Sequence, residues 1–324
     1  MKSSKKFILI SVLLTAILVA VSLFSFPGQI KSPIGQSNKP VDKVLQKEYV
    51  KILFVGDLMF DRGIRYYANK NGGNNFVFEK IYETLLDNDL VLANLEGPIT
   101  NNESVSIITQ PGETNNYFFT FDPSVAKTLF QNNIKLVNLG NNHILNFGRN
   151  GLESTKSYLD KVGVGYFGSP DYPKSISTRI RGTDVTYISY NEFVYLDQET
   201  NQKSTIEEIQ KSKSFSDIVI IFCHWGVEYA SEPTEAQKEL AHKFIDAGAD
   251  LIIGSHPHVI QPAETYKEKR IYYSLGNFVF DQYFSEETKK GLGVIVKIDN
   301  QSKNIDFEEI SFYLQPNGQT TIKQ

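Results

Sequence analysis

Six residues along this sequence carry side chains that proteins commonly use to bind transition metals: Asp57, Glu96, Asn142, His224, His256 and His258. Two carboxylates, one amide oxygen and three imidazoles are enough to hold two divalent ions that share one bridging ligand. Ligands of mixed nitrogen and oxygen type suit Zn, Mn or Fe better than Ca, which prefers oxygen ligands alone. The residue types therefore predict a centre for two divalent metal ions.

Two of the five histidines lie two positions apart in the stretch "LIIGSHPHVIQP", on either side of Pro257. Residues two apart on an extended segment point to the same side, so His256 and His258 can reach neighbouring ions. A lone H-x-H is more often structural than metal-binding. The prediction depends on the whole ordered set, because each of its members follows an apolar run.

Near-continuous apolar runs predict strands that are buried on both faces. We expect them at 49–57, 89–97, 134–143, 217–226, 250–258 and 270–278. Each candidate ligand comes at or near the carboxyl end of one of the first five runs. Open α/β sheets bind ligands at that edge, so residues far apart in the sequence can meet there.

Helices are expected between several of the strands. The segment 122–133 has Asp122 as a plausible N-cap and Pro123 in the first turn. The segment 234–248 has an apolar face and ends in Gly248. Alternating strands and helices predict an α/β layered fold. The tail segments 292–300 and 304–315 alternate apolar and polar residues, so we expect antiparallel strands that close the domain.

The N-terminus has the pattern of a membrane segment. Residues 7–26 form an uncharged apolar run behind three lysines, long enough to cross a bilayer core as a helix. Lysines on that side place residues 1–6 in the cytoplasm and the remaining chain outside. We favour an uncleaved anchor over a cleaved signal peptide, because no small-x-small exit follows. Residues 27–48 then form a linker, and 49–315 form the folded domain.

Composition excludes several classes of protein. The chain has 324 residues, of which 41% are hydrophobic and 22% charged, so a packed core is expected rather than disorder. A net charge of −4 argues against a nucleic-acid partner. The only cysteine is Cys223, which excludes an intrachain disulfide and a cysteine-rich zinc site.

The ordered ligand set resembles that of the calcineurin-like metallophosphoesterases. Longer stretches are more closely similar to the CapA-type capsule-synthesis proteins associated with poly-γ-glutamate. These stretches are "VGDLMFDRGI", "LANLEGPIT", "YFFTFDPSVAKTL", "LVNLGNNHILNFG", "HWGVEY", "DAGADLIIGSHPHVIQP" and "YSLGNFVFDQ", and they cover about residues 52–282. The resemblance implies a metallophosphatase-like αββα sandwich, here preceded by one transmembrane helix.

The resemblance also assigns roles to residues. It implies that Asp57 and His258 bind one ion, that Glu96 bridges, and that the second ion is held by Asn142, His224 and His256. It makes His143 the general acid of a metal-assisted hydrolysis.

Two positions depart from the phosphoesterase pattern. Met59 stands where a histidine ligand is usual, and Glu96 stands where an aspartate is usual. A thioether is a poor ligand for a hard divalent ion, so the ion at Asp57 is expected to bind more weakly. Asp61 can serve as a replacement ligand, or equally as a substrate or turn residue.

Five residues are weaker candidates for substrate binding: Asp61, Arg62, Glu228, Asn277 and Asp281. Arg62 can neutralise an anionic substrate, or it can be an ordinary surface arginine. Asn277 and Asp281 either line a pocket or cap a turn. Glu228 can be a pocket-wall or outer-shell residue.

Three other residues are expected, by default, to have no part in the chemistry. We expect Cys223 to be a small buried residue and His242 to lie on the surface of a helix. Trp225 can be a pocket-wall or outer-shell residue like Glu228, and packing in the interior is its default.

Two classes of function remain open at this stage. One is a membrane-anchored surface hydrolase that acts on phosphoesters or polymer amides. The other is a non-catalytic subunit of an assembly that makes, exports or anchors an anionic polymer, together with other membrane subunits.

Overall fold

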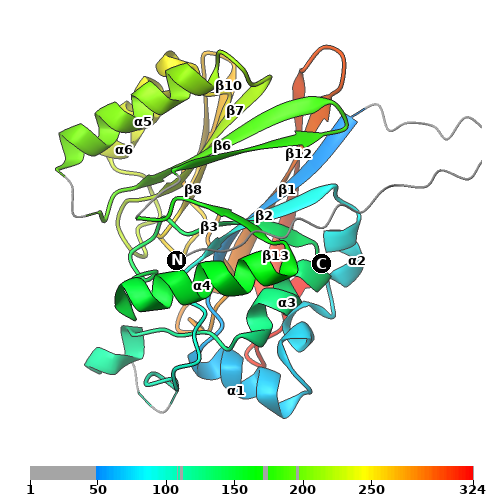
Figure 1. Ribbon diagram of the computed structural model, residues 1–324, viewed down its shortest axis with the longest axis vertical. Helices are drawn as coiled ribbons and strands as arrows, with labels where there is room; N and C mark the ends of the chain where they lie inside the picture. The colour runs from blue at the N-terminus through cyan, green and yellow to red at the C-terminus, as the bar shows by residue number, and fades with distance from the viewer. Residues whose placement is uncertain (1–48, 108, 110–111, 171–173, 195–196, 324) are drawn as a thin grey trace, which may run out of the picture. The chain divides into compact units, whose positions relative to one another are not determined.

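Two β-sheets stack face to face in the computed structural model, which describes residues 49–323 except 108, 110–111, 171–173 and 195–196 (Figure 1). In these residues the first sheet has the order β14 (Thr320–Ile322), β13 (Ile305–Leu314), β12 (Lys290–Asp299), β1 (Tyr49–Leu58), β2 (Leu90–Leu95), β3 (Ile134–Asn138) and β4 (Gly165–Phe167), with β11 (Asn277–Val279) paired to β1. Strands β1 to β4 are parallel, whereas β12, β13 and β14 are antiparallel to their neighbours.

The second sheet has the order β5 (Ser175–Ile180), β6 (Thr183–Asn191), β7 (Ile218–His224), β8 (Leu251–Ser255), β10 (Lys269–Tyr272) and β9 (Ala263–Tyr266). Its central strands β6, β7, β8 and β10 are parallel. Both sheets therefore present a row of carboxyl-terminal strand ends, which is the edge where ligands bind in α/β proteins.

Apolar side chains fill the space between the sheets. Ile52 and Phe54 of β1 lie in one buried cluster with Ile220 and Phe222 of β7. Each such side chain contributes about 1.5–3 kcal/mol when it is fully removed from water. This shared core explains why the strand sequences read as near-continuous apolar runs.

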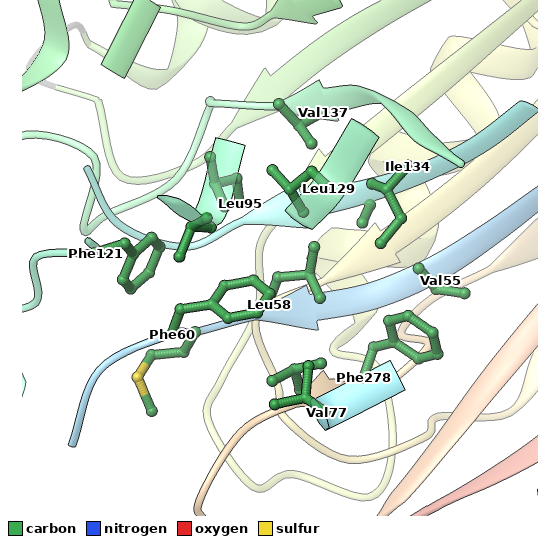
Figure 2. Packing of buried hydrophobic residues seen from close by; sticks show 14 of the residues in the cluster. Val55, Leu58, Phe60, Val77, Leu95, Phe121, Leu129, Ile134, Val137 and Phe278 are labelled. Carbon is green, nitrogen blue, oxygen red and sulfur yellow. The ribbon is translucent and has the colours of Figure 1, made fainter. Parts of the chain in front are cut away.

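Helices cover the outer face of each sheet. The helical elements of the first half are α1 (Arg62–Lys70), η1 (Asn74–Phe78), α2 (Tyr82–Leu86), η2 (Thr114–Tyr117), α3 (Ser124–Gln131) and α4 (Gly148–Val162). Figure 2 shows Leu129 of α3 and Val77 of η1 in one cluster with Leu58 and Val137 of the sheet. On the second sheet, α5 (Gln198–Ser212) and α6 (Glu235–Ala247) pack through Ile209 and Phe244 (Figure 1).

The expected α/β class, the presence of the first five strands and the antiparallel tail are confirmed. Strand β3 ends at Asn138 and β8 at Ser255, so the extended conformation expected for the H-x-H segment is wrong: His256 and His258 lie in a turn beyond β8. The strand expected over 270–278 is wrong as a single element: β10 ends at Tyr272 in the second sheet, and β11 begins at Asn277 in the first. The helix expected from Asp122 begins at Ser124, with Pro123 as the cap residue. The carboxylate of Asp122 still accepts the N–H of Ser124 at 2.8 Å. Asp122 therefore caps the helix from the position before Pro123.

The expected membrane segment at 7–26 lies outside the described residues. Among the residues that the structure does describe, no helix is both long and apolar enough to cross a membrane.

Glycine at position 254 allows a close approach between segments next to the candidate ligands. A Cβ there would lie 1.9 Å from the backbone oxygen of Tyr273 and 2.8 Å from Nε1 of Trp225. That oxygen accepts the indole N–H of Trp225 at 2.9 Å. The glycine before the H-x-H turn is therefore required by packing.

Candidate metal centre

The six predicted ligand residues meet at the carboxyl ends of strands from both sheets. Asp57 lies in β1, Glu96 follows β2 and Asn142 follows β3. In the second sheet His224 ends β7, while His256 and His258 follow β8. Ligand atoms of Asp57, Glu96 and His258 lie within 4.8 Å of one another, and so do those of Glu96, His224 and His256. Glu96 is common to both groups, which is the arrangement expected of a bridging carboxylate.

The two buried carboxylates are joined by an asparagine that the sequence did not single out. Asn94 lies opposite Asp57 in the strand register and donates to its Oδ1 at 2.8 Å. Its Nδ2 is also 3.5 Å from Oε2 of Glu96. Burial, and then the nearby Asp57 carboxylate, raise the pKa of Glu96 well above its usual range. A cation in contact with both carboxylates would remove this repulsion and favour their ionised forms.

His258 is held in one tautomer by Asn277. Nδ2 of Asn277 donates to the backbone oxygen of Thr288 at 2.9 Å, so its Oδ1 is the acceptor that faces Nδ1 of His258 at 2.9 Å. The ring proton of His258 is therefore on Nδ1, and Nε2 presents a lone pair to Oε1 of Glu96 at 3.6 Å. A hydrogen bond to the non-ligating ring nitrogen is the usual support of a metal-binding histidine.

A similar arrangement orients His224. Ser255 lies opposite it in the register, donates its hydroxyl to the oxygen of Cys223 at 2.9 Å, and places Oγ 3.0 Å from Nδ1 of His224. Nδ2 of Asn94 lies 3.3 Å from the same nitrogen, and Nε2 of His224 lies 2.8 Å from Oδ1 of Asn142. A neutral imidazole with its lone pair on Nε2 and this amide oxygen would suit two ligands of one cation. Burial lowers the pKa of His224 well below its usual value, which keeps the ring neutral.

The H-x-H turn has an unusual backbone. His256 has φ 96° and His258 has φ 58°, values that side chains with a Cβ rarely adopt. The N–H of His256 donates to Oδ2 of Asp57 at 3.2 Å, and its ring lies 4.3 Å from that of Phe193. Burial lowers the pKa of His256 to about 3. Strained backbone of this kind concentrates at functional sites, where surrounding contacts impose it.

Two buried polar atoms of the described residues test whether a metal would fit here. Oε1 of Glu96 and Nδ1 of His256 are inaccessible to solvent and have no hydrogen-bond partner. A buried acceptor without a partner costs about 1–3 kcal/mol. Since neutral imidazoles and carboxylates are good ligands for divalent transition metals, the donor set fits the predicted ions.

His143 lies beside the ligand cluster rather than in it. Its Nε2 is 3.9 Å from Oε1 of Glu96, and its ring packs at 4.5 Å on that of Phe119. Oδ1 of Asn146 accepts the N–H of Phe119 at 2.8 Å and lies 3.2 Å from Nδ1 of His143. The proton is therefore on Nδ1, and Nε2 faces the centre as an acceptor. Burial lowers the pKa of His143 to about 4.

Arg62 and Asp281, two of the weaker candidates, form an ion pair with each other. Arg62 also donates to Oδ1 of Asn116 at 3.0 Å and lies 5.0 Å above the ring of Phe119. Both charged residues line a pocket of about 270 Å³ together with Tyr229. Arg62 is thus a partly buried residue that ties segments together, and not an ordinary surface arginine.

Asp61 and Met59 face the start of α1. Asp61 caps this helix and accepts the N–H of Thr120 at 2.9 Å and Nε of Arg65 at 3.0 Å. The sulfur of Met59 accepts the N–H of Asp61 at 3.0 Å, and its side chain is fully buried in the same apolar cluster as Leu58 and Phe60. These contacts give both residues structural roles.

Glu228 is exposed, and one of its carboxylate oxygens lies within 4.8 Å of ligand atoms of His256 and His258. Asn277 is fully buried and orients His258 rather than lining a pocket.

The three residues expected to take no part in the chemistry also have clear positions. Cys223 and Trp225 are fully buried in the cluster under α6, as expected. His242 is partly exposed on α6, where its Nε2 lies 2.7 Å from Oε1 of Glu264 and its ring stacks on that of Tyr266.

Sequence reasoning missed the residues that orient the ligands. Asn94, Ser255 and Asn146 all contact a predicted ligand or His143. Asn94 lies two positions before Glu96, and Ser255 directly precedes His256, so proximity in sequence was an available signal. The strand register was needed to show which ligand each of these residues contacts.

Two stacked sheets between helices, with a mixed nitrogen and oxygen ligand set at their shared edge, define an α/β protein with a candidate two-metal centre. The family model described as "Bacterial capsule synthesis protein PGA_cap" matches residues 51–282, and the chain belongs to this family. The resemblance to CapA-type capsule-synthesis proteins is thereby confirmed.

Two curated relatives are similar along most of the chain. The PGA biosynthesis protein CapA of Bacillus subtilis strain 168 is 31% identical over 264 residues, which cover 76% of this chain and 68% of that protein. The capsule biosynthesis protein CapA of Bacillus anthracis is 28% identical over 279 residues, covering 81% and 67%. Among solved structures, the NAD nucleotidase of Haemophilus influenzae is similar with 13% identity and a TM-score of 0.44, over 85% of this chain and 55% of that one.

Proposed function

We propose that this protein is a membrane-anchored, metal-dependent hydrolase that acts outside the cytoplasm in the synthesis or anchoring of a poly-γ-glutamate capsule. The observation that carries the proposal is that two groups of ligand atoms share Glu96, whose Oε1 is a buried acceptor without a hydrogen-bond partner. Membership of the capsule-synthesis family and two relatives named for capsule or PGA biosynthesis support the polymer as the biological context. A calcineurin-like sandwich remains the architecture that we propose for the two stacked sheets.

In this proposal Glu96 would be shared by two ions. Asp57 and His258 would hold the first ion, and Asn142, His224 and His256 would hold the second. When bound, such ions lower the pKa of water and polarise the oxygen atoms of an ester or amide. Asn277 keeps the imidazole of His258 in the tautomer that directs Nε2 inward, and Ser255 positions the ring of His224.

His143 moves the proton. Because Nδ1 donates to Asn146, Nε2 of His143 is available to accept a proton from the attacking water. The same nitrogen can then return that proton to the leaving oxygen or nitrogen. His143 thus acts as a base before it acts as the acid that the family resemblance implies.

The anchor is part of the proposal. Residues 7–26 would span the membrane, 27–48 would form the linker, and the domain from residue 49 would face the cell envelope. Protease added to intact protoplasts should digest the domain of a full-length protein that sediments with membranes. Recovery of the domain only from inside the cytoplasm would contradict this placement.

Hydrolysis is tested with purified full-length protein stripped of metal and then supplied with Mn or Zn. The substrates are a model phosphodiester and a γ-glutamyl oligomer, because the family resemblance implies either an ester or an amide. We expect metal-dependent turnover that falls about 10²-fold or more in His143→Ala, whereas the matched variant His242→Ala should retain it. Turnover that survives a strong chelator would disprove the proposal.

A second function is favoured by position 59. Met59 contributes its sulfur to the backbone of Asp61, so the usual histidine ligand is absent from the first ion site. A centre of this kind can hold metal for structural reasons in a non-catalytic subunit of a polymer synthase. Full metal loading together with no turnover of either substrate would favour this alternative.

A further inference from the structure

The first ion site lacks the histidine ligand that is usual at position 59. The proposed second ion has four protein ligands, whereas the first has Asp57, Glu96 and His258 only. The side chain of Met59 is buried in the apolar cluster, and its sulfur is occupied by the N–H of Asp61. Any further protein ligand would therefore come from another part of the chain.

Glu228 is in position to supply it. Its carboxylate forms a third group with His256 and His258, whose ligand atoms lie within 4.8 Å of one another. Donor atoms about 2 Å from a shared ion lie at most about 4 Å apart. Because Glu228 is exposed, a change of side-chain rotamer can close the remaining difference without moving the core.

The backbone around Glu228 is fixed to the H-x-H turn. The N–H of Tyr229 donates to the oxygen of Pro257 at 2.8 Å, the residue between the two histidines. Tyr229 has φ 63°, so three strained residues, Tyr229, His256 and His258, meet at this point. Upstream, the N–H of Trp225 donates to the oxygen of Ser255 at 3.2 Å. Backbone hydrogen bonds before and after Glu228 therefore hold this segment beside the turn that carries His256 and His258.

We infer that Glu228 is a further ligand of the metal centre, on the side of the H-x-H turn. The inference rests on the proposed two-metal centre. Glu228 would bind metal together with His256 and His258, which belong one to each of the two proposed ion sites.

Calorimetric titration of metal-free full-length protein with Mn tests this, with Glu228→Ala compared with wild type and with Glu232→Ala. Glu232 is an exposed glutamate on the same loop, outside the three ligand groups. We expect wild type and Glu232→Ala to bind two ions, and Glu228→Ala to bind one of them at least tenfold more weakly. We also expect Glu228→Ala to have an unchanged or higher Tm without metal, and a smaller rise in Tm on addition of Mn.

Each possible result of the titration either supports or contradicts the role of Glu228. If wild type and Glu228→Ala both bind two Mn ions with the same affinities, Glu228 is not a ligand, while the two-metal centre stands. An increase in KM with unchanged Mn binding would instead make Glu228 a substrate contact. If wild type itself binds no metal, both the inference and the proposed function fail.

Discussion

Replacing Asn277 by Ala would test whether the hydrogen bonds behind the ligands control the metal centre. Asn277 is fully buried. It accepts from Nδ1 of His258 at 2.9 Å and donates to the oxygen of Thr288 at 2.9 Å. The substitution would leave both partners without it, and each buried polar group that loses its partner costs about 1–3 kcal/mol. Since Oδ2 of Asp57 remains 3.4 Å from Nδ1 of His258, we expect a loss of about 2–4 kcal/mol.

The effect on metal binding should be separate from the effect on stability. Loss of a hydrogen bond behind a ligand typically lowers metal affinity 10–100-fold, and only the ion bound to His258 should be affected. Calorimetry with Mn measures the affinity, and thermal unfolding of the metal-free protein should show a Tm lower by roughly 5–10 °C.

Asn133→Ala is the matched control. Asn133 is also buried, and it donates to the oxygens of Leu85 and Asn88, both at 2.9 Å, at the opposite end of β3 from the ligands. It should lose comparable stability and keep wild-type affinity for Mn. If Asn277→Ala is destabilised like Asn133→Ala but binds both ions as wild type does, the assigned tautomer of His258 is incorrect.

Three further predictions follow from the same geometry. Metal content by mass spectrometry should fall to well under half in His224→Ala but stay unchanged in His242→Ala; equal content in the two would refute the ligand assignment. Gly254→Ala should lower the free energy of unfolding by about 1–3 kcal/mol or more, because its Cβ would overlap the oxygen of Tyr273; wild-type stability in urea would contradict this. Asp61→Ala should lower stability by about 1–2 kcal/mol through loss of a helix cap, while its metal content stays at the wild-type level; a fall in metal content would restore Asp61 as a ligand.

The sequence predicted those strands whose two faces are both buried in apolar layers. It did not predict β6, although this strand is an interior strand of the second sheet, between β5 and β7. The reason is that Thr186 and Ser189 occupy buried positions in β6, which breaks the apolar run. Helix α5 was missed for a similar reason, since its buried face includes Asn201 and Thr205. Polar residues that are satisfied by tertiary contacts leave no hydrophobic periodicity to detect.

The convergence of the candidate ligands was predictable because each follows an apolar run, and the carboxyl ends of the strands meet at one edge. The residues that orient them were not, because their role depends on register. Asn94 and Asn277 both lie opposite Asp57, on the two strands that flank the end of β1. Ser255 is opposite His224 in the same way. An asparagine or serine near a strand end has many ordinary uses, and only the paired strand shows which ligand it supports.

The position of the candidate ligands in both sheets has a consequence for the folding of the chain. An ion bound to both Asp57 and His258 would close a loop of about two hundred residues. An ion bound to both Glu96 and His224 would link the first sheet to the second. A cross-link over such a distance restricts the unfolded chain much as a disulfide does, by an amount on the order of 5 kcal/mol. This sequence has a single cysteine and cannot form an intrachain disulfide. We propose that this domain lies outside the cytoplasm. Metal binding after export would then stabilise the packing of the two sheets against each other.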